Sequence, residues 1–464
     1  MIEEIGKLEL IEKYKVIKNL IFLIILFLLF FYSFKLDINH DIINNNNLTN
    51  INSINLTIIN QINKKIKVAV YAFGIKNGGR ARVTSILINY FIKIKLFNLF
   101  LFTKVEKQEN EYFIPQNIPR IIIKNKNKII KIINKKKIDI LIYQLSFEDE
   151  IELLNNFKNV KIIFYQHLSI FDWIYGNYTR FKNLYKNYRN CKYVVSIVPF
   201  ENDYIFKKWG INSILMNNFI TYNYKNIISS NLSSKTILMI GRADAKKKRF
   251  HIGINAMEYI INEILDCKML IISDLKGMNN LMILINNLNL NNNIIVNGYT
   301  SMPEIYFKNS SLNIFPSISE AFPMVICETK IFGIPNIIIG IDYITVSEKG
   351  IEIIYDDNPE LLAIKSVNLL KNYEYRKILG TEGRKNMKKF NNDLLLIKWL
   401  KLIISIYNGE IYFEIMKRNE KQMVKNNSLF ILKNQINLLK NRIPEFKNIS
   451  ISDFENFHFM ENIK

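Results

Sequence analysis

The stretch SEAFPMVICETKIFGIPNI, residues Ser319–Ile337, is the most informative segment of this chain and carries two glutamates, Glu320 and Glu328. Seven mostly apolar residues separate the two carboxylates. Pro323 favours the start of a helix, because its missing N–H and its fixed φ cost nothing there. Gly333, followed by a proline two residues later, predicts that the helix ends at that point. We therefore expect a short helix with one glutamate just before it and one inside it.

Short apolar runs flank this helix, Leu312–Phe315 before it and Asn336–Ile339 after it. The unit is thus predicted to be strand, turn, helix, strand. Open parallel sheets bind ligands at the carboxyl ends of their strands, and a helix N-terminus there offers free N–H groups to a phosphate. Glu320 and Glu328 would both point toward such a crevice, where the second carboxylate can accept hydrogen bonds from ribose hydroxyls. The alternative is an ordinary amphipathic helix with two solvated glutamates.

Strand-like apolar runs recur along the rest of the chain and alternate with helical or loop segments, a pattern typical of parallel α/β sheets. They form two series, which predict two doubly wound domains with a boundary near Phe219–Ser234. The first series is Ile66–Phe73, Ile138–Tyr143, Val160–Tyr165 and Tyr193–Val198, and the second is Thr236–Ile240, Lys268–Ile272, Ile294–Val296, Leu312–Phe315 and Asn336–Ile339.

The composition agrees with two globular domains plus appendages, because 464 residues with 49% hydrophobic content and a mean hydropathy of +0.03 can bury two cores. The formal charge of +22 implies attraction to anionic membranes, phosphorylated substrates or nucleic acid. The aromatic residues are not interleaved with the basic runs as in RNA-binding motifs, so no nucleic-acid partner is expected. Three cysteines and four histidines are scattered without pairing or ligand spacing, so neither a disulfide framework nor a zinc site is predicted.

The N-terminus holds an unbroken apolar run, Leu20–Phe34, preceded by three lysines. The run is short for a bilayer core, which needs about 20 residues, but a lysine at its edge can snorkel to the interface. No small-residue cleavage motif follows, so an uncleaved anchor is favoured over a signal peptide. The lysines favour a cytoplasmic tail at 1–19, a transmembrane anchor at 20–34 and a low-complexity stem at 35–64. The expected localisation is a single-pass type II membrane protein of the Golgi or ER.

Two further segments suit an anionic ligand. Gly78 and Gly79 follow the first predicted strand and let the backbone approach a ligand, so they are expected to line a cleft. In the second domain, Arg242 and Lys248 lie six residues apart at the mouth of a strand, where a guanidinium fork and a point charge can clamp a diphosphate. The alternative for this second segment is a solvated basic loop, since three other basic residues adjoin it.

Together these pieces resemble the glycosyltransferases of the GT-B fold, in particular the retaining family 4, over roughly Lys65–Phe390. The resemblance rests on Gly78 and Gly79 with Arg82, on Gly241 and Arg242 followed by Lys248, and on the segment PSISEAFPMVICETKIFGIP. It implies two Rossmann-like domains that face a cleft. These are an acceptor-side domain at 65–220 and a nucleotide-sugar-binding domain at 221–390, followed by a C-terminal helical extension at 391–464.

Through this resemblance, Glu320 is expected to contact the donor sugar and Glu328 the nucleotide ribose. The donor diphosphate is expected to be bound by the first glycine turn, the basic loop and the helix N-terminus, namely Gly79, Arg242, Lys248, Phe322, Pro323 and Met324. The family also has a histidine near the reacting carbon, and His167, after the strand Val160–Tyr165, occupies the matching place. We therefore expect His167 and Glu320 to be catalytic, although a lone histidine is more often structural.

One residue departs from the family pattern. Where the family usually has Glu-Gly-Phe, this chain has Ala321 after Glu320. Alanine does not adopt a positive φ cheaply, so we expect this turn to be right-handed or mildly strained.

The resemblance implies transfer of a sugar from a nucleotide-sugar donor to a glycan, lipid-linked or protein acceptor, with retention of configuration. Positive charge at the leaving phosphate oxygen would come from the protein, so no cofactor and no metal are expected. The basic segment Arg120–Lys137, with eight Lys or Arg and no acid, predicts a helix that lies either on an anionic membrane or with its apolar side in the core. A catalytically inactive GT-B domain that serves as a membrane-tethered partner subunit is the alternative function.

Overall fold

The computed structural model describes residues 64–409 with gaps, together with residues 437, 438, 440 and 441. The gaps fall at residues 77, 146–150, 152, 155–156, 158, 170, 173–190, 200, 203–212, 225–226, 244–245, 275–276, 301 and 342–343. No helix of the described part is long and apolar enough to cross a membrane. The predicted tail and anchor, nearly all of the stem and most of the C-terminal extension lie outside the described residues, so they stay predictions.

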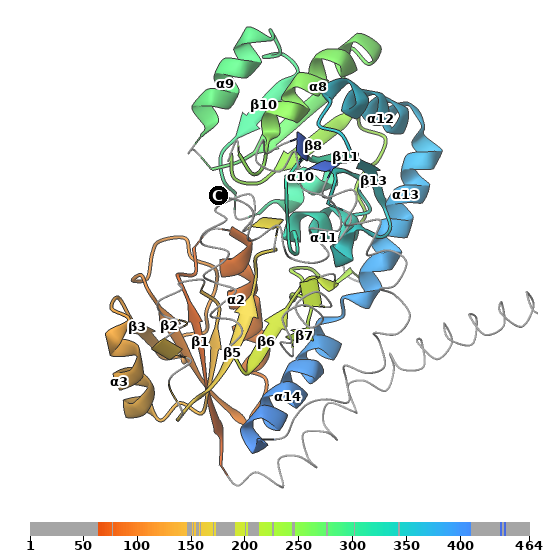
Figure 1. Ribbon diagram of the computed structural model, residues 1–464. Coiled ribbons are helices and arrows are strands. Elements are labelled where there is room, and N and C mark those ends of the chain that lie inside the picture. The colour runs from red at the N-terminus through yellow and green to blue at the C-terminus, as the bar shows by residue number, and fades with distance from the viewer. Residues whose placement is uncertain are drawn as a thin grey trace, which may run out of the picture. The chain divides into compact units, whose positions relative to one another are not determined.

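The first domain is built on a parallel sheet with the strand order β3-β2-β1-β4-β5-β6-β7 (Figure 1). Its strands are β1 (Ile66–Ala72), β2 (Phe97–Thr103), β3 (Arg120–Ile122), β4 (Ile140–Tyr143), β5 (Lys161–Gln166), β6 (Tyr193–Ser196) and β7 (Ser213–Leu215). The central strands are apolar and buried along nearly their whole length, as in parallel sheets that helices cover. The four predicted strands of the first series are confirmed within two residues at each end. The apolar pattern does not predict β2, β3 or β7.

The basic segment 120–137 is not one helix, so that prediction is wrong for its first part. It begins as the edge strand β3 and continues as α3 (Asn127–Lys136). The apolar side of α3 packs into the core through Ile129 and Ile133, which are fully buried, while its lysines face solvent. The alternative of a core-facing helix with a solvated basic face is therefore confirmed for α3.

The second domain has a parallel sheet with the order β10-β9-β8-β11-β12-β13 (Figure 1). Its strands are β8 (Thr236–Ile240), β9 (Lys268–Ile272), β10 (Ile294–Asn297), β11 (Leu312–Phe315), β12 (Asn336–Ile339) and β13 (Ile351–Ile354). All five predicted strands are confirmed, and β13 is an addition. The helices are α8 (Phe250–Glu263), α9 (Met278–Asn287), α10 (Glu304–Lys308), α11 (Met324–Ile331), α12 (Pro359–Lys371) and α13 (Tyr373–Asn386).

In both sheets the strand order reverses next to the first strand, between β1 and β4 and between β8 and β11. Doubly wound sheets bind ligands in the crevice outside the carboxyl ends of their strands at this point. The polar stretch 219–234 lies between the last strand of the first sheet and the first strand of the second. The chain is thus a two-domain α/β protein with the topology that the sequence predicts.

Helix α11 begins and ends close to where Pro323 and Gly333 predict. Pro323 is the residue before the helix rather than its first residue, with an extended ψ of 109°, and Gly333 closes the far end with a φ of 73°. Ala321 does not have a positive φ, so its turn needs no glycine. Nearly every side chain of the helix is buried, and Glu328 is 1% exposed. The alternative of an amphipathic helix with solvated glutamates is therefore wrong.

A long helix, α14 (Asn392–Asn408), runs back beside the first sheet (Figure 1). Its Trp399 is fully buried and packs edge-on against Phe91 of α2 (Gly78–Phe91) and Tyr165 of β5, with ring centroids 5.8 and 5.1 Å apart. At the end of α14, the Lys161 Nζ donates to the carbonyls of Ile406 and Tyr407 at 2.8 and 2.9 Å. This helix therefore fastens the end of the second domain to the first.

Replacing Trp399 by alanine should lower the free energy of unfolding by about 3 to 5 kcal/mol, because a large cavity opens between α14 and the first sheet. Denaturant unfolding measures the change. Lys401→Ala is the matched control, since Lys401 is exposed on the same helix and should change stability by less than about 0.5 kcal/mol. Equal small effects of both variants would show that α14 is not part of the first domain's core.

Candidate active site

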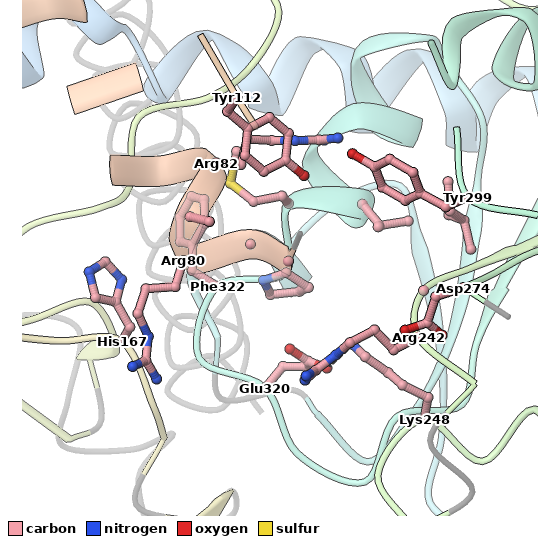
Figure 2. A pocket seen from close by; sticks show the side chains of 18 of the residues that line it. Arg80, Arg82, Tyr112, His167, Arg242, Lys248, Asp274, Tyr299, Glu320 and Phe322 are labelled. Carbon is pink, nitrogen blue, oxygen red and sulfur yellow. Dashed lines mark hydrogen bonds and ion pairs between the residues drawn. The ribbon is translucent and has the colours of Figure 1, made fainter. Parts of the chain in front are cut away.

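A cleft of about 570 Å³ opens where the carboxyl ends of the two sheets face each other. The first domain lines it with the start of α2 and with His167 just after β5. The second domain lines it with the residues after β8, with the turn that holds Glu320, and with the start of α11. Figure 2 shows Arg242, Lys248 and Glu320 on one side of this cleft and His167 on another. All nine predicted site residues line the cleft, including the helix start at residues 322–324.

Two helices point their N-termini into the cleft. Gly79 is in the first turn of α2, and Met324 is the first residue of α11. A Cβ placed on Gly79 would lie 3.9 Å from the Met324 Cγ atom, so the two helix ends lie close together. Gly78 has a φ of 84°, a left-handed conformation that favours glycine where the strand turns into α2. The free N–H groups and partial positive charge of both ends suit an anionic ligand.

Lys248 and Glu320 form an ion pair at the second-domain side of the cleft. The Lys248 Nζ is 2.5 Å from the Glu320 Oε1 atom, and the Ser317 hydroxyl donates to the same oxygen at 2.6 Å. Burial raises the pKa of Glu320, but Lys248 and Lys247 outweigh this effect and lower it below its usual value. Arg242 is exposed at the cleft and has no ion pair among the residues that the structure describes. One cation is thus held by a carboxylate, and another is available to a ligand.

The neighbouring basic residues have partners of their own. Lys247 pairs at 2.5 Å with Asp172 of the first domain, which also accepts a hydrogen bond from the Ser319 hydroxyl at 2.5 Å. Arg249 is buried, pairs with Asp357 at 2.7 Å and donates from its Nε atom to the Pro316 carbonyl, just after β11, at 2.9 Å. The segment is therefore not a solvated loop, because these two residues hold the domains and the loop in place.

Glu328 is held between the domains. Its Oε1 atom accepts hydrogen bonds from Arg82 of α2 and, at 2.9 Å, from the Thr221 hydroxyl. Burial raises the pKa of Glu328, and the Arg82 guanidinium offsets part of that rise. The Arg82 side chain is 16% exposed, against 1% for that of Glu328. Burial lowers the pKa of Arg82, but the neighbouring Glu328 and Tyr112 outweigh this effect and raise it. The sequence analysis named Arg82 in the family motif but gave it no role.

Two tyrosines that the sequence analysis missed close this end of the cleft. The Arg82 guanidinium carbon lies 5.3 Å from the centre of the Tyr112 ring, and both Tyr112 and Tyr299 line the cleft. Figure 2 shows their hydroxyl groups pointing toward each other from the two domains. Tyr112 lies in a loop without a recognisable pattern. Tyr299 could have been found, because it follows the predicted strand at 294–296 at its carboxyl end.

His167 lies at the opposite end, against the first domain. Its ring centroid is 4.1 Å from that of Tyr165, whose hydroxyl donates to the Asn218 Oδ1 atom at 2.6 Å. Its Nε2 atom is buried and has no hydrogen-bond partner among the residues that the structure describes. Burial and the charge of Arg80 place the pKa of His167 well below its usual range. The imidazole is therefore neutral, with one nitrogen available to a hydroxyl group in the cleft.

In the described part of the chain, no group of three or more His, Cys, Asp or Glu side chains is arranged to hold a metal ion. The three cysteines are free and buried, in agreement with the prediction that no disulfide framework exists.

The second domain identifies the chemistry. Residues 222–386 match the family described as Glycosyl transferases group 1, and this range contains Arg242, Lys248, Glu320 and Glu328. The protein is a glycosyltransferase. The match to group 1 is confined to the second domain. No curated protein sequence matches the chain.

Solved structures confirm the GT-B fold of this glycosyltransferase. A sucrose-phosphate synthase from Thermosynechococcus elongatus is similar with a TM-score of 0.61 and 15% identity, over 75% of this chain and 100% of that one. A glycosyltransferase from Rickettsia africae has a TM-score of 0.57 and 18% identity, over 74% of this chain and 99% of that one. The HepE protein from Anabaena, solved with UDP-glucose, has a TM-score of 0.61 and 11% identity, over 74% and 100% of the chains. At these identities the likeness concerns the fold alone.

The arrangement of the basic loop predicts different effects for two neighbouring lysines of the glycosyltransferase. Lys248→Ala should lower the rate of sugar transfer by about a hundredfold or more, because a cation at the leaving oxygen stabilises charge that develops in the transition state. Lys246→Ala should leave the rate within about twofold, because Lys246 is exposed in the same loop and does not line the cleft. Transfer rates with the full donor measure both. A similar loss in both variants would mean that the loop contributes only general positive charge.

Proposed function

We propose that this protein is a membrane-anchored glycosyltransferase that transfers a sugar from a nucleotide-sugar donor to a glycan, lipid-linked or protein acceptor with retention of configuration. The observation that supports it most is that Lys248, Arg242 and the N-terminus of α11 line the same cleft. The buried carboxylate of Glu328 also lines this cleft. This set matches the sequence of groups along a nucleotide sugar: ribose, diphosphate, then sugar.

In the proposed donor complex, the Glu328 carboxylate accepts hydrogen bonds from the ribose hydroxyls. The diphosphate lies on Arg242, Lys248, the α11 start at residues 322–324 and the backbone near Gly79. Glu320 then reaches the hydroxyl groups of the sugar. His167, with its unpartnered Nε2 atom, lies on the first-domain side, where it can hydrogen-bond to the sugar near the reacting carbon.

The proposed reaction breaks the bond between the sugar C1 atom and the β-phosphate oxygen, and the electron pair of that bond stays on the oxygen. Arg242, Lys248 and the helix N-terminus stabilise this negative charge without needing to move during the reaction. The acceptor hydroxyl attacks C1 on the face that the phosphate leaves, and its proton passes to the departing phosphate. Configuration is then retained, and the protein supplies the positive charge that a metal would otherwise provide.

The proposed attachment to the membrane relies on the apolar run at residues 20–34, with the catalytic part translocated into the lumen of the ER or Golgi. Helix α3 contributes at most electrostatic attraction, because Ile129 and Ile133 are used in the core and only its basic face is exposed. The stem would give the catalytic domains reach from the bilayer.

Replacing each of the two glutamates by alanine should impair a different property, diphosphate binding for Glu328 and the transfer rate for Glu320. Glu328→Ala should weaken binding of the free nucleoside diphosphate, by about 1.5 to 3 kcal/mol for a lost hydrogen bond to a charged group. Glu320→Ala should leave that binding nearly intact while the transfer rate falls about a hundredfold or more, because its contacts form with the sugar. Calorimetry with UDP, GDP and ADP, together with transfer rates from the matching sugar donors, measures both quantities. UDP-glucose, the ligand in the HepE structure, is the first donor to test.

Both variants must be shown to fold, by thermal unfolding, before the comparison is made. If both bind the diphosphate and transfer sugar like the parent protein, the proposed roles are wrong. If both lose diphosphate binding equally, Glu320 acts on the phosphate end through Lys248 rather than on the sugar.

The anchor predicts that residues 20–34 stay in the mature protein. N-terminal sequencing of the isolated full-length protein should find a start before residue 20, and the protein should remain in membranes after extraction at high pH. In intact vesicles, protease added outside should leave the catalytic part uncut. A mature chain that begins after residue 34 would replace the anchor by a cleaved signal peptide, and digestion from outside would reverse the topology.

A further inference from the structure

We propose that Arg82, from the acceptor-side domain, is a positioning residue for the donor nucleotide: it holds the Glu328 carboxylate charged and oriented for the ribose. Recognition of the nucleotide would then require both domains, because the first domain orients the carboxylate of the second domain that binds the ribose. This inference rests on the proposed role of Glu328 in ribose binding.

The contact itself crosses the cleft. Arg82 lies in the first turns of α2, and its Nη1 atom donates to the Glu328 Oε1 atom of α11, 246 positions further along the chain. The Thr221 hydroxyl, from the segment between the two sheets, donates to the same oxygen at 2.9 Å. Two donors on one oxygen fix the plane of the carboxylate. No hydrogen bond to its other oxygen is present among the described residues, so that oxygen can accept one from the ribose.

A carboxylate in this place needs a cation. Glu328 is 1% exposed, and burial of a carboxylate without a partner favours its protonated form. The other ionisable groups that face it are Glu304 of α10, Tyr222 after the first sheet and Cys327 on its own helix. None of these three supplies positive charge. Arg82 is thus the group that keeps the carboxylate an acceptor for ribose hydroxyls.

Arg82 is itself held in place by groups of the cleft. The centre of the Tyr112 ring lies 5.3 Å from the guanidinium carbon, and the Tyr112 and Tyr299 hydroxyl groups point toward each other from the two domains (Figure 2). These contacts orient the guanidinium before any ligand enters. They also mean that moving the domains apart would separate Arg82 from Glu328 and weaken the ribose site.

The test compares binding of the best of UDP, GDP and ADP to the full-length protein and its variants at a series of pH values. Arg82→Ala should weaken binding about ten- to a hundredfold near pH 7, since a charge-assisted contact is lost from the ribose site. Without Arg82, the pKa of Glu328 rises further, so the carboxyl is protonated at lower pH and ionises as the pH increases. The affinity of the variant relative to the parent should therefore recover as the pH is raised above neutral. Arg82→Lys, which keeps the charge but not the planar fork, should lose less.

Three controls separate this inference from simpler explanations. Glu328→Gln should weaken binding without the pH-dependent recovery, and adding Arg82→Ala to it should cause little further loss. Lys161→Ala removes the hydrogen bonds from the start of β5 to the Ile406 and Tyr407 carbonyls of α14, at the end of the first sheet away from the cleft. It should reduce thermal stability without changing affinity. Thermal unfolding of each variant shows whether it is folded at the temperature of the measurement.

Each failure has its own meaning. If Glu328→Gln binds as well as the parent, the proposed ribose role is wrong and this inference falls with it. If Glu328→Gln loses affinity and Arg82→Ala does not, the inference alone is overturned. A loss in Arg82→Ala that is the same at every pH, or that Lys161→Ala reproduces, would also overturn it, because Arg82 would then act only by joining the domains.

Discussion

A carboxylate kept out of water between two domains is the constraint on which the donor end of this cleft depends. Glu328 is 1% exposed, and its charge is compensated by Arg82 from the other domain rather than by a residue of its own sheet. Breaking a buried pair by removing one partner typically costs 3 to 5 kcal/mol, because the remaining charge is left without compensation. The closed arrangement of the domains is therefore tied to the ionisation of one side chain.

Helix α11 provides the fixed platform for that side chain. It is buried on nearly every side, and even its Lys330 is inside, where the ammonium donates to the Val346 carbonyl and to the Asn386 Oδ1 atom at 2.9 Å each. Burial lowers the pKa of Lys330 to about 7, so the helix tolerates a lysine there only because its hydrogen bonds are satisfied. A helix so enclosed cannot rotate, which keeps its free N–H groups and Glu328 aimed at the same part of the cleft.

Local signals explain what could be predicted from the sequence. Pro323 and Gly333 mark the ends of α11 because they act on their own backbone, and the buried parallel strands of the second sheet are continuous apolar runs. Strand β2 (FNLFLFT) escaped prediction because it follows the apolar end of α2 without a glycine or proline to separate them. Strands β3 and β7 have three residues each, too few for any period to emerge. The Arg82 to Glu328 contact joins residues 246 positions apart, so nothing in either local pattern indicates it.

The two ends of the proposed donor site differ in how ready they are for a ligand. At the ribose end, Arg82 is fixed by Tyr112, so Glu328 is already oriented. At the phosphate end, Lys248 is paired with Glu320, and a diphosphate must compete for its ammonium. Because Ser317 donates to the same Glu320 oxygen at 2.6 Å, that carboxylate stays held in place when Lys248 turns to the phosphate. Binding of the diphosphate would thus release Glu320 from Lys248 so that it can bind the sugar hydroxyls. With a nucleotide that carries no sugar, Glu320 would have no ligand to bind.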